Sequence, residues 1–380
     1  MNYKNLMILA SLFACGSALA EVKVGIILSE TGPAASVGAT QLRTVGILPS
    51  KLGGQQVQYI VLDDASDPSQ AVKDAHKLID ERQIDVLIGP SLSPSSLALL
   101  DIVASAETPM ISLAGAGAIV SPVDNRRRWV FKTPQSDAQM AELVVTNMSA
   151  AGVKSYAFVG FNDAYGDGWL EQMGKYAKLA GIRQVASERY SKTDASVVGQ
   201  MLKVMSSRPD AVFIAASGTP AALPQVFLHE HGYQGMVYQT HGVANNDFLR
   251  IGGKAVEGTL LPAGPVLVAE QLPRSHPARQ PALDFVQKYE ALPGAGIRST
   301  FAAYLWDASL ILDHAIESVP STVLPGSKDF REALRNAIEK TTDLHATNGV
   351  YTMSPSDHLG LDARGRVMVK IVDGKWKLQP

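Results

Sequence analysis

A cluster of serines follows a short apolar run in the first third of the chain. Residues 86–88 are Val-Leu-Ile, a Gly-Pro pair interrupts the run, and serines at 91, 93, 95 and 96 precede a second apolar segment. This pattern predicts a buried strand, a tight loop and the start of a helix. Hydroxyls and free backbone N–H groups at a helix N-terminus can bind a carboxylate. The same serines could instead act only as helix caps.

Other groups of reactive residues do not complete a catalytic or metal-binding pattern. Residues 89–93 begin like a nucleophile elbow but lack its closing glycine. Residues 115–117 lack the further glycine and the acidic partner of a dinucleotide-binding loop. The segment His229-Glu-His231 could hold a metal, but it lies at a polar helix end and lacks further ligands. We therefore expect a binding protein rather than an enzyme, with no cofactor and no metal.

The first 20 residues have the features of an export signal. A basic start precedes an apolar run at 6–14 that is too short to cross a bilayer, and residues 18–20 form a small-residue cleavage site. We expect cleavage after Ala20 and a periplasmic protein. Residues 12–15 offer an alternative lipoprotein site that would leave a lipidated Cys15, although the phenylalanine in it is bulky for such a site.

Charge and cysteine content argue against several classes of function. Lys and Arg total 34 and Asp and Glu total 36, which gives a formal net charge of −2. A slightly acidic chain does not favour nucleic acid or an anionic membrane surface as a partner. Cys15 is the only cysteine and would leave with the export signal, so neither disulfides nor thiol chemistry are expected in the mature chain.

The reactive loops are positioned by strand-like and helix-like segments that alternate along most of the chain. Apolar runs at 22–28, 57–62, 86–88 and 109–113 are separated by helix-like stretches, such as 69–82, and a second series starts after residue 134. The tail resembles a β-hairpin with an Asp-Gly turn. This alternation predicts an α/β fold with doubly wound parallel sheets. In such sheets, ligands bind beyond the carboxyl ends of the strands.

Several ordered motifs together resemble one protein family. The motifs are VGIILSETGP at 24–33, the acidic turn within 62–71, IGP at 88–90, DAYG at 163–166 and HGVAN at 241–245. They are similar to those of the branched-chain amino acid type of periplasmic substrate-binding proteins of ABC importers, and the resemblance extends from residue 21 almost to the C-terminus. It implies a type I periplasmic binding protein fold, with two doubly wound Rossmann-like lobes joined by a three-segment hinge.

The resemblance implies that the chain crosses between the lobes three times. We place the crossings at 132–137, 262–265 and 347–352, where polar residues, prolines or glycines form each joint. The predicted boundaries follow directly from these joints: lobe 1 comprises residues 21–133 and 266–346, and lobe 2 comprises residues 134–265 and 347–380.

The resemblance also implies where a ligand carboxylate binds. Amino-acid-binding members hold it with a serine after the strand at 86–88 and with backbone groups of the next loop, and Ser93 and Ala114 match these positions. Ala116 stands where the family usually has a threonine, so N–H groups of Ala116 or Gly117 are expected to replace the lost hydroxyl. Each hydrogen bond to a carboxylate contributes roughly 1.5–3 kcal/mol, so losing one weakens the site without abolishing it.

His241 is the main departure from the family pattern. Amino-acid-binding members have a glutamate before Gly-Val-Ala-Asn, and this glutamate pairs with the ammonium of the ligand. A desolvated ammonium without a counter-charge costs several kcal/mol, so α-amino acids are expected to be poor ligands. An imidazole would instead donate to a keto, hydroxyl or carboxylate oxygen. The alternative is that His241 only packs beneath its loop.

Aromatic residues are expected to form the rest of the site. Tyr165 keeps the family's aromatic ring, and Trp306 stands where the family usually has tyrosine. These two rings, with Ser217, Gly218 and Thr219 from lobe 2, would suit a flat apolar body. Trp306 could equally be a core residue, and Tyr304 is a weaker candidate for the same wall.

The sequence therefore predicts a monomeric periplasmic receptor that closes on a small organic anion and delivers it to an inner-membrane ABC permease. The expected ligand is an aromatic carboxylate or a 2-oxo acid. Two alternatives remain open. One is a receptor for a branched-chain amino acid or amide, and the other is a secreted hydrolase built on a doubly wound sheet.

Overall fold

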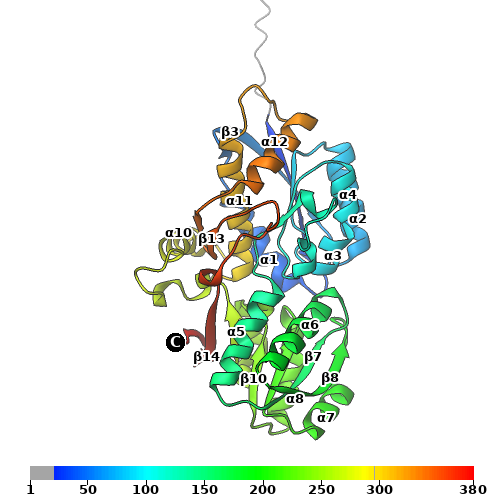
Figure 1. The fold of residues 1–380 in the computed structure, drawn as a ribbon, viewed down its shortest axis with the longest axis vertical. Coiled ribbons are helices and arrows are strands. Elements are labelled where there is room, and N and C mark those ends of the chain that lie inside the picture. The colour runs from blue at the N-terminus through cyan, green and yellow to red at the C-terminus, as the bar shows by residue number, and fades with distance from the viewer. Residues whose placement is uncertain (1–20, 295) are drawn as a thin grey trace, which may run out of the picture.

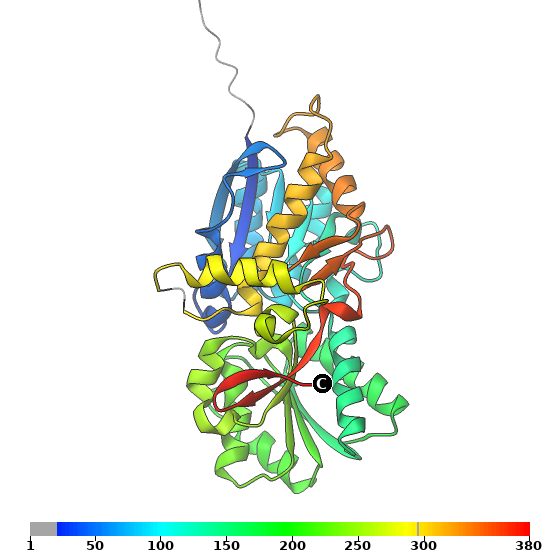
Figure 2. The ribbon, with the colours of Figure 1, turned by 90° about the vertical axis from the view of Figure 1, so that its left-hand side faces the viewer.

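A computed structural model describes residues 21–294 and 296–380. The predicted export signal and Cys15 lie outside the described residues. The chain forms two α/β lobes that lie end to end, with the N-terminal strands in the upper lobe and the C-terminus on the lower one (Figures 1 and 2). This arrangement confirms the predicted fold class, and the lobes are called lobe 1 and lobe 2 below.

Lobe 1 is built on a six-stranded sheet with the order β2-β3-β1-β4-β5-β6. All neighbouring pairs are parallel except β2 and β3. The apolar run of β1 is almost wholly buried, as expected for a strand covered by helices on both faces. The strands are β1 (Val22–Leu28), β2 (Lys51–Leu52), β3 (Gln55–Asp63), β4 (Val86–Ile88), β5 (Met110–Ser112) and β6 (Val130–Lys132).

Helices from two separate parts of the chain cover this sheet. They are α1 (Ala35–Val45), α2 (Pro68–His76), α3 (Ser93–Ala98), α4 (Leu100–Ser105), α10 (Arg279–Glu290), α11 (Thr300–Glu317) and α12 (Lys328–Glu339). The helix predicted at 69–82 is α2 followed by a π-helical turn, Lys77–Glu81. The segment after the serine loop forms two short helices, α3 and α4, rather than one, with a break at Leu99.

Lobe 2 is built on a seven-stranded sheet with the order β15-β14-β11-β10-β9-β7-β8. Five neighbouring strands, β11, β10, β9, β7 and β8, are parallel to one another. The predicted tail hairpin adds β14 and β15, which pair in antiparallel fashion. The strands are β7 (Ser155–Phe161), β8 (Arg183–Tyr190), β9 (Ala211–Ala215), β10 (Met236–Gln239), β11 (Leu260–Ala263), β14 (Val367–Val372) and β15 (Lys375–Leu378). The helices are α5 (Asp137–Ala150), α6 (Ala164–Leu179), α7 (Val198–Ser206), α8 (Ala222–Glu230) and α9 (Asn246–Gly252).

The first crossing lies where the sequence placed it, whereas the second and the third lie later in the chain, since Leu267, Val268 and Leu272 after β11 still pack in the lobe 2 core. The chain leaves lobe 1 between β6 and α5 and leaves lobe 2 after β11. A small hairpin, β12 (Leu344–Ala346) with β13 (Gly349–Tyr351), then stays on lobe 1. Side chains as late as Leu361 pack in the lobe 1 core, and Met368 is the first C-terminal side chain in the lobe 2 core. The third crossing is therefore at 362–366, not at 347–352.

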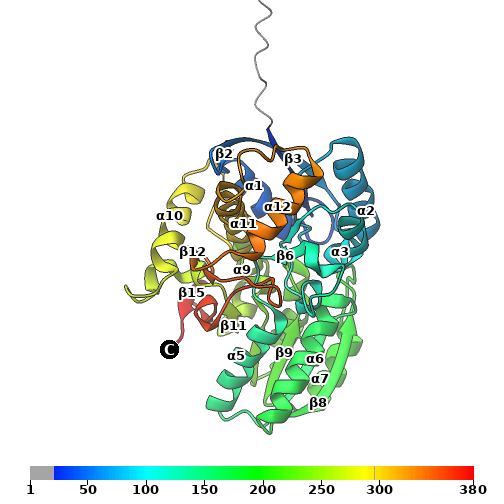
Figure 3. The ribbon, with the colours of Figure 1, turned by 45° about the horizontal axis from the view of Figure 1, so that its top comes forward.

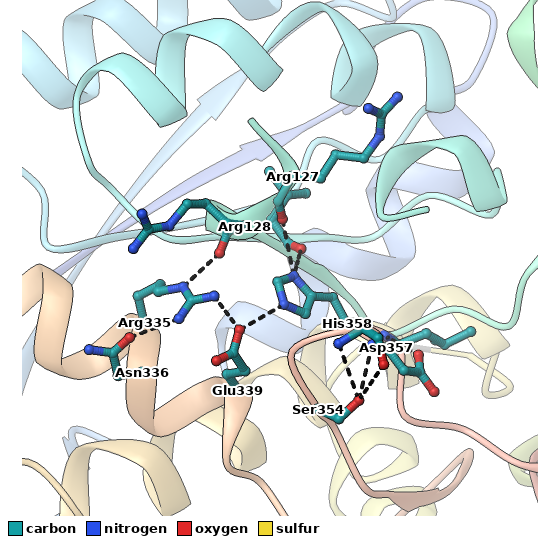
Figure 4. Close-up of polar contacts among 11 residues, drawn as sticks. Arg127, Arg128, Arg335, Asn336, Glu339, Ser354, Asp357 and His358 are labelled. Carbon is teal, nitrogen blue, oxygen red and sulfur yellow. Dashed lines mark hydrogen bonds and ion pairs between the residues drawn. The ribbon is translucent and has the colours of Figure 1, made fainter. Parts of the chain in front are cut away.

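His358 explains why the loop after β13 remains on lobe 1. Its Nδ1 contacts the carbonyl oxygens of Arg127 at 3.0 Å and Val130 at 2.9 Å, and its Nε2 lies 3.1 Å from Glu339 Oε2 (Figure 4). Glu339 also pairs with Arg335, whose Nε donates to the Arg128 carbonyl oxygen at 2.7 Å. The histidine ring stacks on Phe131 with centroids 4.3 Å apart. This buried network joins the loop to α12 and β6, and no local pattern in the sequence announces it.

Candidate functional site

A cavity lies between the carboxyl ends of the strands of the two lobes. The cavity is narrow: the volume inside it that is open to the centre of a water molecule is about 40 Å³. In Figure 3, α3 of lobe 1 lies above α6 of lobe 2, and these helices are in contact. The cavity residues discussed below are Val37, Ser93, Gly115, Phe161, Asp163, Tyr165, Lys192, Ser217, His241, Phe301 and Tyr304.

The two lobes touch each other on two sides of this cavity. Gly115 of lobe 1 approaches His241 of lobe 2 so closely that a Cβ atom on Gly115 would lie 2.8 Å from the imidazole Nε2. The Thr219 N–H donates to Ser36 Oγ across the lobes at 3.2 Å. Gly218 has a φ of +63°, which favours glycine at this point of the loop. The structure thus shows the lobes closed on each other.

Ser93 lies at the cavity as predicted, but the backbone donors predicted beside it are already engaged. The N–H groups of Ala114, Ala116 and Gly117 donate to Ser112 Oγ, Ser93 Oγ and Asp137 Oδ1, each at 3.2 Å. Of this loop it is Gly115 that lines the cavity, and its N–H makes no hydrogen bond to the described residues. The assignment of N–H donors to Ala116 and Gly117 is therefore wrong, because neighbouring side chains satisfy them.

His241 is buried, with only 2% of its surface exposed. Burial, and secondarily the nearby Lys132 ammonium, lower the pKa of its imidazole to about 3. The ring packs near Tyr165 and Trp169, with centroid distances of 6.3 and 5.7 Å. Its Nδ1 is buried and has no hydrogen-bond partner among the described residues. His241 is thus a neutral imidazole in the cavity wall, with its Nε2 toward Gly115.

The lowered pKa of His241 predicts how stability depends on pH. Between about pH 6.5 and pH 3, the unfolded chain binds a proton at this histidine that the folded protein does not bind. The free energy of unfolding therefore decreases as the pH falls through this window, with a slope of up to about 1.4 kcal/mol per pH unit from this group. Urea unfolding at pH 7.0, 5.5 and 4.5 should show that His241→Gln removes this contribution. A stability difference between wild type and variant that is independent of pH would contradict the assignment.

Lys132 is buried behind the loop that carries Gly115 and Ala116, and the sequence did not predict a role for it. Its Nζ donates to the carbonyl oxygens of Gly115 at 2.6 Å and Ala116 at 3.2 Å. Burial lowers the pKa of Lys132 to about 7, and the charge of Asp137 partly opposes this shift. Burial raises the pKa of Asp137, and Lys132 opposes that shift in turn. The lysine therefore fixes the carbonyl oxygens of Gly115 and Ala116 through hydrogen bonds. A lone lysine at the end of an apolar strand was the available signal.

The aromatic wall of the cavity differs from the predicted one. Tyr165 lines the cavity, and its hydroxyl donates to Thr240 Oγ1 at 2.9 Å. Tyr304 also lines it, and its hydroxyl donates to Gln135 Oε1 at 3.0 Å. Because both hydroxyls are engaged by protein, these residues offer mainly their ring surfaces to a ligand. Phe161 and Phe301 complete the wall.

Trp306 lies outside the cavity, so its assignment to the ligand wall is wrong. It packs in a separate core with Phe285 of α10, at a ring distance of 5.9 Å, and Lys288 lies over its ring. The reason is helical geometry. Phe301 and Tyr304 are three residues apart and share one face of α11, whereas position 306 is turned about 200° away from position 304.

The loop after β9 contributes one of its three predicted residues to the cavity. Ser217 lines it, whereas Gly218 and Thr219 face Ser36 in the contact between the lobes. Val37 is a buried part of the cavity wall. Gly218 and Thr219, through their contacts with Ser36, join the two lobes beside the cavity.

Asp163 and Lys192 form a charged pair in the cavity wall that sequence reasoning missed. Lys192 Nζ lies 3.2 Å from Asp163 Oδ2, and the side chains are 21% and 18% exposed. The other carboxylate oxygen of Asp163 accepts from the N–H groups of Tyr165 and Gly166 and caps α6. The position of Lys192 two residues after a strand, at the ligand edge of the sheet, was the signal that could have identified it.

Comparison with known proteins agrees with the fold. A family profile described as periplasmic binding protein matches residues 21–370. The chain belongs to the type I periplasmic binding protein family, a family of solute-binding receptors. Within the described residues, no helix has the length and apolar character needed to cross a membrane, and no group of His, Cys, Asp and Glu could hold a metal ion.

Three individual proteins illustrate how similar this chain is to known members of the fold. An extracellular ligand-binding receptor from Rhodopseudomonas palustris HaA2 is 42% identical, with a TM-score of 0.92 over 95% of this chain and 100% of that chain. Leu/Ile/Val-binding protein homolog 3 of Brucella melitensis is 26% identical over 68% of this chain and 73% of its own length. A solute-binding protein from R. palustris BisB5, solved with 3,4-dihydroxybenzoic acid, shares the fold at 20% identity and a TM-score of 0.78, covering 94% and 95% of the two chains.

Proposed function

We propose that this protein is the periplasmic receptor of an ABC importer and that its ligand is a small aromatic carboxylate or 2-oxo acid. The observation that carries the proposal is the neutral His241, whose Nε2 faces Gly115, in an aromatic-walled cavity that Ser93 also lines. Export through the leader at 1–20 and delivery to an inner-membrane permease complete the proposed role. The protein acts as a monomer in this scheme.

Each polar group at the inner end of the cavity can contact an anionic ligand. Ser93 Oγ accepts a hydrogen bond from Ala116, so its own hydrogen remains available for a carboxylate oxygen. The Gly115 N–H offers a second donor, and His241 can donate to a keto or second carboxylate oxygen. The rings of Tyr165 and Tyr304 enclose the apolar body. Contacts to both lobes stabilise the closed arrangement.

The charge distribution of the cavity argues against an α-amino acid. Asp163 is the carboxylate in the cavity wall, and it is already bound to Lys192 and to two N–H groups of α6. A ligand ammonium would therefore be desolvated without a free counter-charge, which costs several kcal/mol. The dihydroxybenzoic acid in the R. palustris BisB5 protein shows that the fold accommodates an aromatic acid.

A receptor for branched-chain amino acids is the second candidate. The observation in its favour is the similarity to Leu/Ile/Val-binding proteins, including the B. melitensis homologue. The two candidates differ in the charge that the ligand must carry, so one binding experiment separates them.

Benzoylformate should raise the melting temperature, and leucine should not. A ligand that binds only the folded state contributes about 2.7 kcal/mol at 100 times its Kd, which shifts the melting temperature by several degrees. Thermal unfolding with each compound, followed by calorimetry, measures this. Benzoylformamide is the matched control because it keeps the ring and the keto group but lacks the anion. Tight leucine binding together with no response to aryl acids would overturn the ligand assignment.

A further inference from the structure

The Asp163–Lys192 pair lies in the cavity wall but has no role in holding a carboxylate at Ser93 and Gly115. Lys192 follows β8, and Asp163 begins α6 after β7. Both side chains are more than three-quarters buried, yet both line the cavity. An ion pair that is partly removed from water at the wall of a binding site can contribute directional hydrogen bonds to a ligand.

The order of strands separates this pair from the inner polar group around His241. The relevant part of the lobe 2 sheet runs β10-β9-β7-β8, with His241 after β10 and Lys192 after β8. Three strand spacings of about 4.8 Å amount to about 14 Å along the sheet edge. The side chains of His241 and Lys192 extend into the cavity, so the distance between their polar atoms is shorter than this spacing. Ser217 follows β9, and Phe161 and Tyr165 flank Asp163 at the end of β7, which lies between β10 and β8. His241 and Lys192 therefore lie at different places along the ligand edge of the sheet, and aromatic residues from the end of β7 come from between them.

The chemistry of the pair selects one kind of group at the outer end. Lys192 Nζ can only donate hydrogen bonds, and Asp163 Oδ2 can only accept them while it is ionised. A hydroxyl group both donates and accepts, so it can bind between them and satisfy both. A second carboxylate would face the charge of Asp163, and an ammonium would face the charge of Lys192.

We propose that Asp163 and Lys192 form a second polar subsite that binds a hydroxyl group on the ligand at the end opposite its carboxylate. The preferred ligand class is then an elongated aromatic acid with a phenolic hydroxyl in the para position. This inference rests on the proposed function, since it assigns the orientation of the same ligand in the same cavity. Lys192 and Asp163 determine specificity in this scheme, and the inner group supplies the anion site.

The test compares two acids that differ by one hydroxyl, 3-phenylpropanoate and 3-(4-hydroxyphenyl)propanoate. Wild-type protein should bind the hydroxylated acid about 10- to 100-fold more tightly in calorimetry, as expected for a hydrogen bond to charged groups. Lys192→Met should abolish that preference by weakening the hydroxylated acid alone, while 3-phenylpropanoate changes by less than about threefold. Thermal unfolding checks that the variant remains folded.

Lys203→Met is the matched control. Lys203 also follows an acidic partner in lobe 2, with Nζ 3.2 Å from Glu188 Oε2, but its side chain is 70% exposed and lies outside the cavity. This variant should keep the full preference for the hydroxylated acid. If 3-phenylpropanoate binds and the hydroxyl adds nothing, or if Lys192→Met retains the preference, the subsite is refuted while the anion receptor stands. If neither acid binds wild-type protein, the proposed function and the subsite both fail.

Discussion

Replacing His241 with glutamate should reduce the affinity for an aryl carboxylate at least about 100-fold. The side chain is buried at the cavity, so the new carboxylate would face the anionic ligand without water between them. Two like charges about 4 Å apart repel by roughly 4 kcal/mol at an effective dielectric constant near 20, which corresponds to about a 1000-fold loss. The Lys132 ammonium, which already acts on His241, offsets part of this repulsion. Calorimetry with benzoylformate measures the effect.

His241→Gln is the matched control for this experiment. Glutamine has the length of glutamate but no charge, and its amide can still donate to a ligand oxygen. We expect it to lose no more than about tenfold in affinity. We also expect His241→Glu to bind leucine more tightly than wild-type protein does, because its carboxylate can pair with an ammonium. Unchanged binding of aryl acids by His241→Glu would show that His241 does not face the ligand.

Replacing Lys132 with methionine should lower the free energy of unfolding by about 3–5 kcal/mol, because it removes the charge that opposes burial of Asp137 and the donor of two carbonyl oxygens. Two carbonyl oxygens, of Gly115 and Ala116, lose their donor in this variant, and the buried Asp137 loses its counter-charge. The loop that carries Gly115 should therefore also lose its fixed position at the cavity. Urea unfolding at pH 7 measures the change in stability.

The double variant Lys132→Met, Asp137→Asn separates the charge from the packing. It removes the unpaired carboxylate but keeps its shape and its capacity to accept from Gly117 and Ala138. We expect it to recover at least half of the stability lost in the single variant. A single variant that loses less than about 1 kcal/mol, or a double variant no more stable than the single one, would show that the two charges are not coupled.

Much of the architecture could be predicted because its signals are local. Buried β-branched runs such as β1 alternate with amphipathic helices, and that alternation specifies parallel sheets covered on both faces. The Asp-Gly turn at 373–374 specified the terminal hairpin. The third crossing could not be located, because the loop after β13 is held by His358 through partners that come from α12 and the segment before β6.

The residues of the candidate site were likewise predictable only in part. Ser93, Tyr165, Ser217 and His241 were expected at the cavity, and they line it, since each follows a strand at the ligand edge; their contacts with a ligand remain predictions. The phase of α11 decided that Tyr304, and not Trp306, reaches the cavity.

The sequence by itself determined the class of protein, the strand-end loops that meet at the cavity, and the absence of a glutamate at position 241. Only the tertiary structure decided which donors of those loops are free. The side chains of Ser112, Ser93 and Asp137 accept hydrogen bonds from three backbone N–H groups of the loop. The N–H of Gly115, which lines the cavity, is left without a partner among the described residues. Only the tertiary structure places Lys132 near Asp137 and Lys192 next to Asp163. The physical reason is that hydrogen bonding and charge pairing between loops depend on distances set by the packed sheets, whereas strand and helix patterns depend on neighbours along the chain.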